Sequence, residues 1–304
     1  MLSALLLLAA CAAPSANEAG AASAGLEGTV WDASTGEAIS EAALDQRLAS
    51  ARFVLLGEKH DNPAHHRKQA DLLDRMAATG RRPPVVWEMI DASKGAVLKA
   101  YLESGRATPE GLGRVLDWGG SGWPEWEIYQ PIAEVALRRG LQQYPGNIER
   151  PIIRTVMQDG FGGLPNVTAQ VLATNARWTD DDAQALKTEL VDSHCGVMPE
   201  GMMRPMGLVQ RARDAVMAAA LLEADVGAGA VLIAGNGHVR ADRGVPRYLE
   251  PETNVLSIGI LEAHEGETDA MAYLEGPGHF DIVIFTESVQ SPDRCEALRK
   301  RFGK

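Results

Sequence analysis

Two short segments of the sequence share one form, an apolar run followed by Gly-x-x-His. One is FVLLGEKH at residues 53–60, and the other is VLIAGNGH at residues 231–238. A glycine permits a sharp turn where a strand ends, and each turn would carry its histidine, His60 or His238, past that end. In open α/β sheets, ligands bind in the crevice at the carboxyl ends of the strands. The repetition therefore predicts that the two imidazoles lie in one site.

Two carboxylates are expected beside these histidines. Glu58 lies in the first turn, and Glu88 ends the apolar run VVWE. Two imidazoles and two carboxylates could hold a Zn, Mn, Fe or Co ion and leave positions open for hydrolysis. Glu58, His60, Glu88 and His238 are thus a candidate metal site, in which one glutamate could act as general base. The opposing interpretation is that the histidines only hydrogen-bond and hold the turns. The absence of a His-Glu-x-x-His pattern excludes a thermolysin-like site.

The elements that must position these residues follow from the apolar pattern. Runs such as FVLL and DIVIF are continuous, which is typical of strands covered on both faces in a parallel sheet. The sequence predicts strands at residues 52–56, 84–87, 152–156, 230–234, 255–260 and 281–285. Helical patterns between them fall at residues 63–79, 93–103, 124–139, 179–193 and 204–224. This alternation predicts an α/β fold, a large mostly parallel sheet flanked by helices. Residues 92–145 show no strand pattern and predict a small inserted helical subdomain.

The first residues are typical of an export signal. Residues 1–10 are apolar and uncharged, and they are too short to span a bilayer, which needs about 20 residues. The segment LAAC at residues 8–11 resembles a bacterial lipobox, which implies cleavage before Cys11 and its lipidation. Residues 11–25 then form a flexible tether to a domain at residues 26–304. We expect a lipid-anchored protein of the cell envelope, on the periplasmic face and at the outer membrane. The alternative is a buried or frayed apolar terminus.

Charge and cysteine content narrow the functional classes. Asp and Glu number 41 against 29 Lys and Arg, a net charge of −12, which repels polyphosphate and excludes nucleic acid as a partner. Cys195 and Cys295 remain besides Cys11, and in an oxidising compartment they could form a disulfide. Two free buried thiols are the alternative. Neither belongs to a Cys-x-x-Cys pair, which argues against a thiol–disulfide catalyst.

Several longer segments carry a family resemblance. They are LLGEKHDNPAHH from residue 55, VVWEM from 85, SGWPEWEIYQPI from 121, DSHCG from 192, QRARDAVMA from 210 and AGNGHVRADRGVPRYL from 234. The chain resembles the ChaN-like haem-binding lipoproteins, in a superfamily with the TIKI, TraB and erythromycin esterase proteins. The resemblance implies a parallel sheet with a small helical domain, and haem bound at the membrane surface by a homodimer through a tyrosinate. In the TIKI branch, Gly-x-x-His turns and an acidic residue carry metal-dependent peptidase activity. We therefore predict a haem-binding lipoprotein associated with iron uptake, with a metal-dependent hydrolase as the alternative.

The resemblance leaves the haem ligand open among the tyrosines, since phenolate is a suitable donor to ferric iron. Tyr129 is the first candidate, because three tryptophans lie close to it in the sequence. Tyr248, on a short helix after His238, is the second, and both could instead be core tyrosines. The match around QRARD favours Arg213 as a cation for a haem propionate or a substrate carboxylate. An ordinary surface ion pair is the alternative for Arg213.

Two further groups need an interpretation. His65 and His66 stand at a helix start, where we expect a solvated pair, although His65 could reach the same crevice. Four methionines with a neighbouring histidine could bind Cu(I) in a metallochaperone. We favour an adaptable apolar patch over the pocket. These residues are Met198, Met202, Met203, Met206 and His194.

Overall fold

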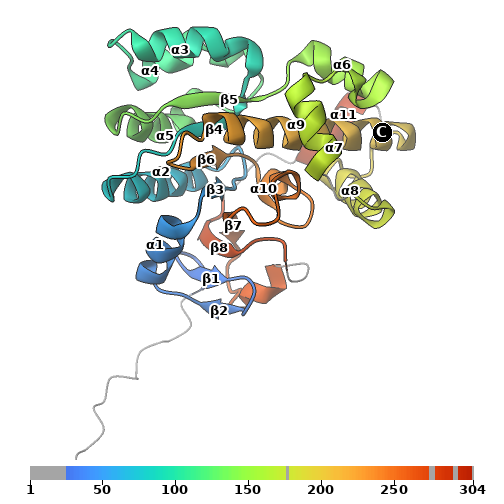
Figure 1. Cartoon of the computed structure of the whole chain (residues 1–304). Helices are drawn as coiled ribbons and strands as arrows, with labels where there is room; N and C mark the ends of the chain where they lie inside the picture. The colour runs from blue at the N-terminus through green and yellow to red at the C-terminus, as the bar shows by residue number, and fades with distance from the viewer. Residues whose placement is uncertain (1–24, 176–177, 274–277, 290–293, 303–304) are drawn as a thin grey trace, which may run out of the picture.

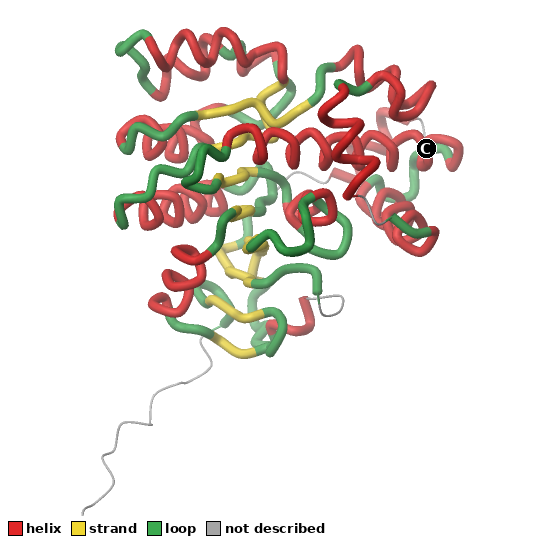
Figure 2. The backbone as a smooth tube through the Cα atoms, viewed as in Figure 1, coloured by secondary structure: helices red, strands yellow, loops and turns green. Residues whose placement is uncertain are grey.

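A single eight-stranded sheet organises the chain, in the strand order β2-β1-β8-β7-β3-β6-β4-β5 (Figures 1 and 2). The computed structural model describes residues 25–175, 178–273, 278–289 and 294–302. The predicted signal peptide, Cys11 and nearly all of the predicted tether lie outside these residues. The strands are β1 (Val30–Asp32), β2 (Glu37–Ala38), β3 (Phe53–Leu56), β4 (Val85–Asp91), β5 (Gln143–Asn147), β6 (Ala230–Ile233), β7 (Val255–Ala263) and β8 (Ile282–Glu287).

Strands β3 to β8 pair in parallel, and only the short β1 and β2 add antiparallel pairs at one edge. The predicted α/β fold with a mostly parallel sheet is therefore confirmed. All four residues of β3 and of β6 are buried, as the continuous apolar runs require. Ile233 of β6 pairs with Leu56 of β3 and with Trp87 of β4. This register aligns the carboxyl ends of β3 and β6 with Trp87 of β4, the residue directly before Glu88.

Helices cover both faces of the sheet, and in Figure 1 α1 to α5 lie on the left and α6 to α10 on the right. The left layer packs against Val54, Leu56 and Trp87, and the right layer packs against Phe53, Leu55. Helix α8 packs on α9. The helices are α1 (Glu41–Ser50), α2 (Pro63–Ala78), α3 (Gly95–Glu103), α4 (Pro109–Val115), α5 (Trp126–Arg138), α6 (Arg150–Asp159), α7 (Asn166–Asn175), α8 (Asp180–Ser193), α9 (Glu200–Ala224), α10 (Asn236–Val239) and α11 (Arg294–Phe302). Short 3₁₀ turns are η1 (Ala92–Lys94), η2 (Trp118–Gly120), η3 (Gly160–Gly163), η4 (Val245–Tyr248) and η5 (Ala270–Tyr273).

The structure differs from the sequence predictions at two places in the middle of the chain. Residues 152–156 form part of helix α6, where Pro151 occupies the first turn and the apolar residues lie along one helix face. The sequence also missed strand β5, which begins in the last three residues of the stretch predicted to be helical, residues 92–145. Strand β5 pairs only with β4, and an edge strand tolerates Pro145 and a weakly apolar sequence. The inserted helices therefore end before residue 143.

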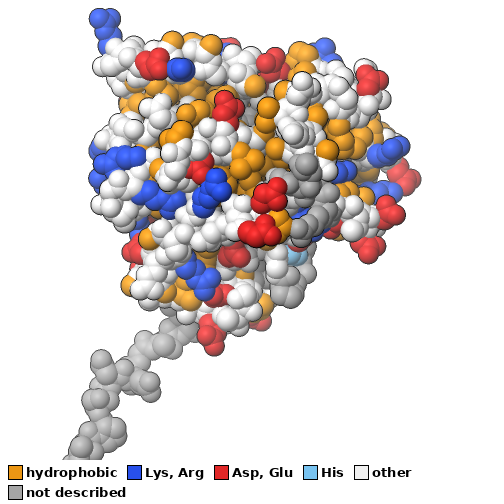
Figure 3. Space-filling view, viewed as in Figure 1, with side chains coloured by type: hydrophobic (Ala, Val, Ile, Leu, Met, Phe, Trp, Pro, Cys, Tyr) orange, Lys and Arg blue, Asp and Glu red, His pale blue; other side chains and the backbone are white. Residues whose placement is uncertain are grey.

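On the face drawn in Figure 3, acidic and basic side chains are scattered among uncharged and hydrophobic ones. Between residues 25 and 302, with the gaps given above, no helix combines the length and apolarity needed to cross a bilayer.

Helix α2 begins as its sequence predicts, because the Asn62 side chain accepts a hydrogen bond from the Ala64 amide and Pro63 follows it. This start fixes the chain directly after the first Gly-x-x-His turn.

Candidate functional site

The two Gly-x-x-His turns lie side by side at the carboxyl ends of β3 and β6. The Asn236 amide donates to the Glu58 carbonyl at 2.9 Å. The Asn236 side chain donates to the Ile260 carbonyl at 2.7 Å and accepts from the Ile260 amide at 3.1 Å. These bonds tie the second turn to the first turn and to β7. The predicted meeting of His60 and His238 is therefore present in the structure.

Glu88 lies between the two histidines. Its Oε1 is 3.3 Å from His238 Nε2, its Oε2 is 3.8 Å from His60 Nε2, and the Gly235 amide donates to Oε2 at 2.8 Å. The side chain is 1 % exposed. Burial alone would raise the pKa of Glu88, but His238 and His60 outweigh it and lower the pKa to about 2. The glutamate is thus a buried anion that depends on its histidine neighbours.

Asp214 of α9 completes the surroundings of His238. Its Oδ1 lies 2.6 Å from His238 Nδ1, so both ring nitrogens of His238 face carboxylates. Burial would lower the pKa of His238, but Glu88 and Asp214 raise it to about 10. Burial raises the pKa of Asp214 to about 6, despite the opposing effect of His238. His238 is therefore held as an imidazolium, which has no lone pair to offer a ligand.

A second group surrounds Glu58. Its Oε1 is 2.6 Å from His60 Nδ1 and accepts a hydrogen bond from Tyr129 Oη at 3.0 Å. Its Oε2 lies 3.3 Å from His66 Nε2, without the angles of a hydrogen bond. Burial disfavours the charged carboxylate, but His66 and His60 hold the pKa of Glu58 well below its ordinary value. His66 also stacks on Tyr129, with ring centroids 4.0 Å apart.

The expectation of a solvated His65–His66 pair was wrong, because these side chains are only 1 % and 0 % exposed. His65 Nδ1 accepts a hydrogen bond from the Lys59 amide at 2.8 Å, which supports the first turn from behind. Burial lowers the pKa of His65 to about 4, so the ring is neutral at ordinary pH. His65 and His66 therefore support the site from beneath, and His66 contacts the Glu58 carboxylate.

The two turn glycines are required by close packing. Neither Gly57 nor Gly235 has a positive φ, so the conformational freedom expected from the sequence is not their reason. A Cβ on Gly235 would lie 2.9 Å from His60 Nε2. A Cβ on Gly57 would lie 2.1 Å from Asn236 Oδ1 and 3.0 Å from the Ile258 carbonyl. The absent side chains let one turn lie directly against the other.

We expect Gly57→Ala to lower the free energy of unfolding by about 1–3 kcal/mol, the usual effect of forcing a methyl group into a packed region. The clash would separate Asn236 from β7 and weaken the contact between the turns. Urea denaturation followed by circular dichroism measures the change. Gly201→Ala is the matched control, because Gly201 lies in α9 with open space around its Cβ position. Equal stability of the two variants would contradict the packing argument.

A cavity of about 930 Å³ opens over the turns. The histidines His60, His194 and His238 line it, together with Trp123, which lies 4.8 Å from the His60 ring. One side of α8 supplies a wall. Further lining residues include Glu58, Lys59, Trp178, Leu186, Leu190 and Arg243. The cavity therefore combines flat apolar faces with imidazoles and both signs of charge.

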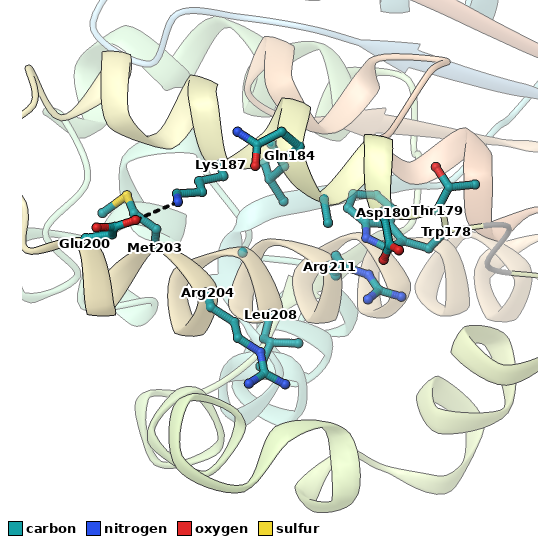
Figure 4. Close-up of a pocket in the computed structure, with 13 residues that line it drawn as sticks. Trp178, Thr179, Asp180, Gln184, Lys187, Glu200, Met203, Arg204, Leu208 and Arg211 are labelled. Atoms are coloured by element: carbon teal, nitrogen blue, oxygen red, sulfur yellow. Dashed lines mark hydrogen bonds and ion pairs between the residues drawn. The ribbon is translucent and has the colours of Figure 1, made fainter.

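A second cavity of about 530 Å³ lies between α8 and α9 and shares Trp178 and Leu186 with the first (Figure 4). The Arg211 guanidinium lies 4.5 Å from the Trp178 ring centre and 5.0 Å from that of Phe161. An apolar cluster adjoins this region and confirms the favoured interpretation of the methionines as an apolar patch. It contains Leu186, Leu190, Met203, Trp178, Met198, Met202 and Met206. The Cu(I) alternative stays a prediction.

The tyrosines chosen from the sequence do not line the large cavity. Tyr129 and Tyr248 are both 0 % exposed, and Tyr129 lies behind the Glu58–His60 pair. Burial, together with Glu58, raises the pKa of Tyr129 far above its ordinary value, and burial also raises that of Tyr248. As they stand, neither can present a phenolate to a ligand in the cavity. Their role as haem ligands stays a sequence prediction without support from the geometry.

Arg213 is half-buried on α9 and does not line either cavity. Its Nε is buried with no hydrogen-bond partner in the described part of the chain. Its charge helps to lower the pKa of Glu88 and opposes the rise at Asp214. The structure therefore places Arg213 near the site's carboxylates, where it acts on them through space.

The predicted metal set comes together without forming a metal-binding geometry. Among the described residues, no group of three or more His, Cys, Asp or Glu side chains is arranged to hold a metal ion. The reason is visible at His238, whose two nitrogens both face carboxylates, and at His60, whose Nδ1 is taken by Glu58. The opposing interpretation, in which the histidines hold the turns, describes this arrangement better.

Comparison with known proteins decides the family. Residues 44–249 match the family model described as "Haem-binding uptake, Tiki superfamily, ChaN". The chain belongs to this family. The match covers both Gly-x-x-His turns, Glu88, α8 and α9, and so includes the whole lining of the cavity. No curated protein matches the chain.

Three solved structures resemble the chain to different degrees. A structure of cofacial haem binding to ChaN of Campylobacter jejuni matches with a TM-score of 0.66 and 20% identity, over 84% of this chain and 95% of that one. The type III effector HopBA1 matches with a TM-score of 0.48 and 15% identity, over 81% and 92%. The erythromycin esterase EreC, in its open conformation, matches with a TM-score of 0.43 and 15% identity, over 73% and 72%. At 20% identity the first structure supports the ChaN-like fold, and the other two carry no argument.

Proposed function

We propose that this member of the haem-binding family binds haem in the large cavity over the two turns. The observation that carries the proposal is that the matched segment contains a cavity suited to haem. Its volume of about 930 Å³ lies at the upper end of the range for cofactor sites, about 300–1,000 Å³. Trp123 and Trp178 offer flat apolar faces to a porphyrin. Lys59 and Arg243, which now pair with Glu262 and Glu189, supply cations for propionates.

We further propose an exported protein, anchored through Cys11 and associated with iron uptake, in which haem is the cargo. The lipobox-like segment at residues 8–11 supports the anchor. The disulfide between Cys195 and Cys295 supports export, because disulfides persist in oxidising compartments. Detergent phase separation of membranes tests the anchor, since Cys11→Ser should move the protein to the aqueous phase. Sedimentation with and without hemin tests the proposed homodimer.

A hemin titration of the full chain, purified with a histidine-free tag, tests haem binding. We expect a shifted Soret band that saturates with hemin. Trp123→Ala should weaken the affinity on the order of tenfold, which corresponds to about 1.4 kcal/mol, because it removes one wall. Trp31→Ala is the control, since Trp31 lies on strand β1, far along the sheet from β3 and β6, and does not line the cavity. Wild-type protein that gives no saturable Soret shift would contradict the proposal.

The hydrolase alternative remains a separate proposal with less support. Only the proximity of His60, His238 and Glu88 favours it, and their side chains as they stand do not form a metal site. Elemental analysis of protein isolated from its native membrane separates the two. Iron with a Soret band supports haem binding, whereas a lone divalent metal, lost in His60→Ala, supports the hydrolase.

We predict that Tyr129→Phe leaves the absorbance spectrum of the hemin-bound protein unchanged. The phenol lies behind Glu58, so its loss should remove one buried hydrogen bond and lower the free energy of unfolding by about 1 kcal/mol. Absorbance spectra and urea denaturation of the same samples measure both effects. A Soret band altered only in this variant would show that Tyr129 reaches the iron, as the sequence resemblance implied.

A further inference from the structure

His194 stands where α8 ends and lines the large cavity together with Leu190 and Ser193 of the same helix. It belongs to neither Gly-x-x-His turn, and its side-chain hydrogen bonds do not involve Glu58, Glu88 or Asp214. The sequence suggested a role for His194 only as a Cu(I) ligand beside the four methionines. Its chemistry in the cavity therefore needs its own explanation.

The hydrogen bonds of His194 fix which nitrogen is available. Nδ1 lies 2.8 Å from the Leu190 carbonyl oxygen and 3.1 Å from Ser193 Oγ. A carbonyl oxygen can only accept, so Nδ1 must carry the hydrogen. In the neutral ring, the lone pair then belongs to Nε2, which makes no hydrogen bond within the described part of the chain. An imidazole oriented by a backbone carbonyl through one nitrogen is the usual state of a histidine that binds metal through the other.

The other lining side chains are poorly suited to bind iron. Of the residue types that bind haem iron as axial ligands, the described lining contains histidine and lacks tyrosine, cysteine and methionine. Both nitrogens of His238 face carboxylates, at 2.6 and 3.3 Å. His60 Nδ1 is bound to Glu58, and its Nε2 is directed at Glu88. His194 is thus the histidine of this cavity whose second nitrogen is not directed at an acid.

The backbone around His194 is fixed in place. The Cys195 amide donates to the Asp192 carbonyl at 2.9 Å, and the Gly196 amide donates to the Val191 carbonyl at 2.9 Å. Cys195 is joined by a disulfide to Cys295 of α11, which connects the end of α8 to the last helix. A side chain on a constrained helix end loses little conformational freedom when it binds a metal, which favours a high affinity.

We propose that His194 Nε2 is the axial ligand of haem iron in this cavity, an inference that rests on the proposed haem binding. His194 Nε2 would supply the lone pair that holds the iron, with no change of oxidation state. Trp178, Leu186 and Leu190, which line the same cavity as His194, are available to contact the apolar porphyrin. The carboxylates around His60 and His238 then face the haem without binding its iron.

The test compares full-length wild-type protein with His194→Gly and His194→Gln. Quenching of tryptophan fluorescence by hemin reports binding, and absorbance with electron paramagnetic resonance reports the iron ligand. We expect a histidine-ligated spectrum in the wild type, its loss in both variants, and an affinity at least tenfold lower. Added imidazole should restore the wild-type spectrum in His194→Gly, where the deletion leaves room for it. His264→Gly is the matched control, because His264 is exposed and does not line the cavity.

The outcomes separate the inference from the function on which it rests. Wild-type protein that fails to bind hemin overturns the haem-binding proposal and this inference with it. Wild-type and His194 variants that bind hemin with the same spectrum overturn the inference alone. Loss of the spectrum in both His194 variants with rescue by imidazole, while His264→Gly behaves as wild type, supports it. Circular dichroism shows that the compared proteins are folded.

Discussion

Replacing Glu88 by glutamine should lower the free energy of unfolding by about 3–5 kcal/mol at pH 6. The substitution keeps the shape of a side chain that is 1 % exposed but removes the charge between His60 and His238. Breaking a buried ion pair by removing one partner has this magnitude, because the other charge stays buried. Urea denaturation at pH 6 measures the difference between variant and wild type.

The pH dependence gives this prediction its control. The pKa of Glu88 falls from 4.5 to about 2 on folding, so its stabilisation is full above pH 4.5 and is lost as pH falls through about 2. The pKa of His238 rises from 6.5 to about 10, so its stabilisation is full below pH 6.5 and is lost as pH rises through about 10. The free energy of unfolding of Glu88→Gln should therefore differ most from that of the wild type between pH 4.5 and 6.5, and less near pH 10.

An exposed pair provides the matched substitution. Glu287 pairs with Arg67 at 2.7 Å, and both side chains are about half exposed, at 49% and 57%. Glu287→Gln should change stability by less than about 1 kcal/mol, because solvent screens such pairs. If Glu88→Gln is as stable as Glu287→Gln across this pH range, the buried charge does not organise the site.

The central strands and the two turns could be predicted because their signal is local. Strands β3 and β6 are continuous apolar runs, and a run of that kind must be covered on both faces. Strand β5 could not be found in this way. It lies at the sheet edge, contains Pro145, and owes its conformation to pairing with β4 rather than to its own composition.

The residues that support the site could not be placed from the sequence alone, although the helix pattern indicated that some of them are buried. His66 lies four residues before Ala70 and seven before Leu73, so it shares the buried face of α2. Asp214 lies in the same way four residues before Ala218 in α9. A polar residue in line with the apolar face of a helix indicates a buried polar contact. The contacted group, Glu58 or His238, lies on another element and could be identified only from the packing.

The same limit applies to the haem ligand. Tryptophans near Tyr129 in the sequence suggested an apolar wall around a phenolate, and the structure does place Trp118 beside Tyr129, with ring centroids 5.0 Å apart. The two rings belong to the core, where Tyr129 supports Glu58. Trp123 lines the cavity instead. Trp118 lies in the turn η2 and Trp123 in the loop before α5, so proximity to Tyr129 along the chain did not reveal which ring faces the ligand.

Removal of the disulfide should have the second large effect. Cys195 and Cys295 are separated by 100 residues, with Cα atoms 5.6 Å apart, and closing a loop of that length restricts the unfolded chain by up to about 4.7 kcal/mol. We expect the double variant Cys195→Ser, Cys295→Ser to lose about 2–4 kcal/mol of unfolding free energy. Urea denaturation measures it, and dithiothreitol should destabilise the wild type but leave the variant unchanged.

The position of the bridge links this loss of stability to the cavity. Cys195 directly follows His194, so without the bond to α11 the end of α8 loses its covalent link to the last helix. Hemin affinity of the double variant should fall more than that of the Trp31→Ala control, because ordering His194 then opposes binding. Oxidised and reduced wild-type proteins that unfold at the same urea concentration would show that the bridge does not stabilise the fold. Equal hemin affinity of those two forms would show that the bridge does not position His194.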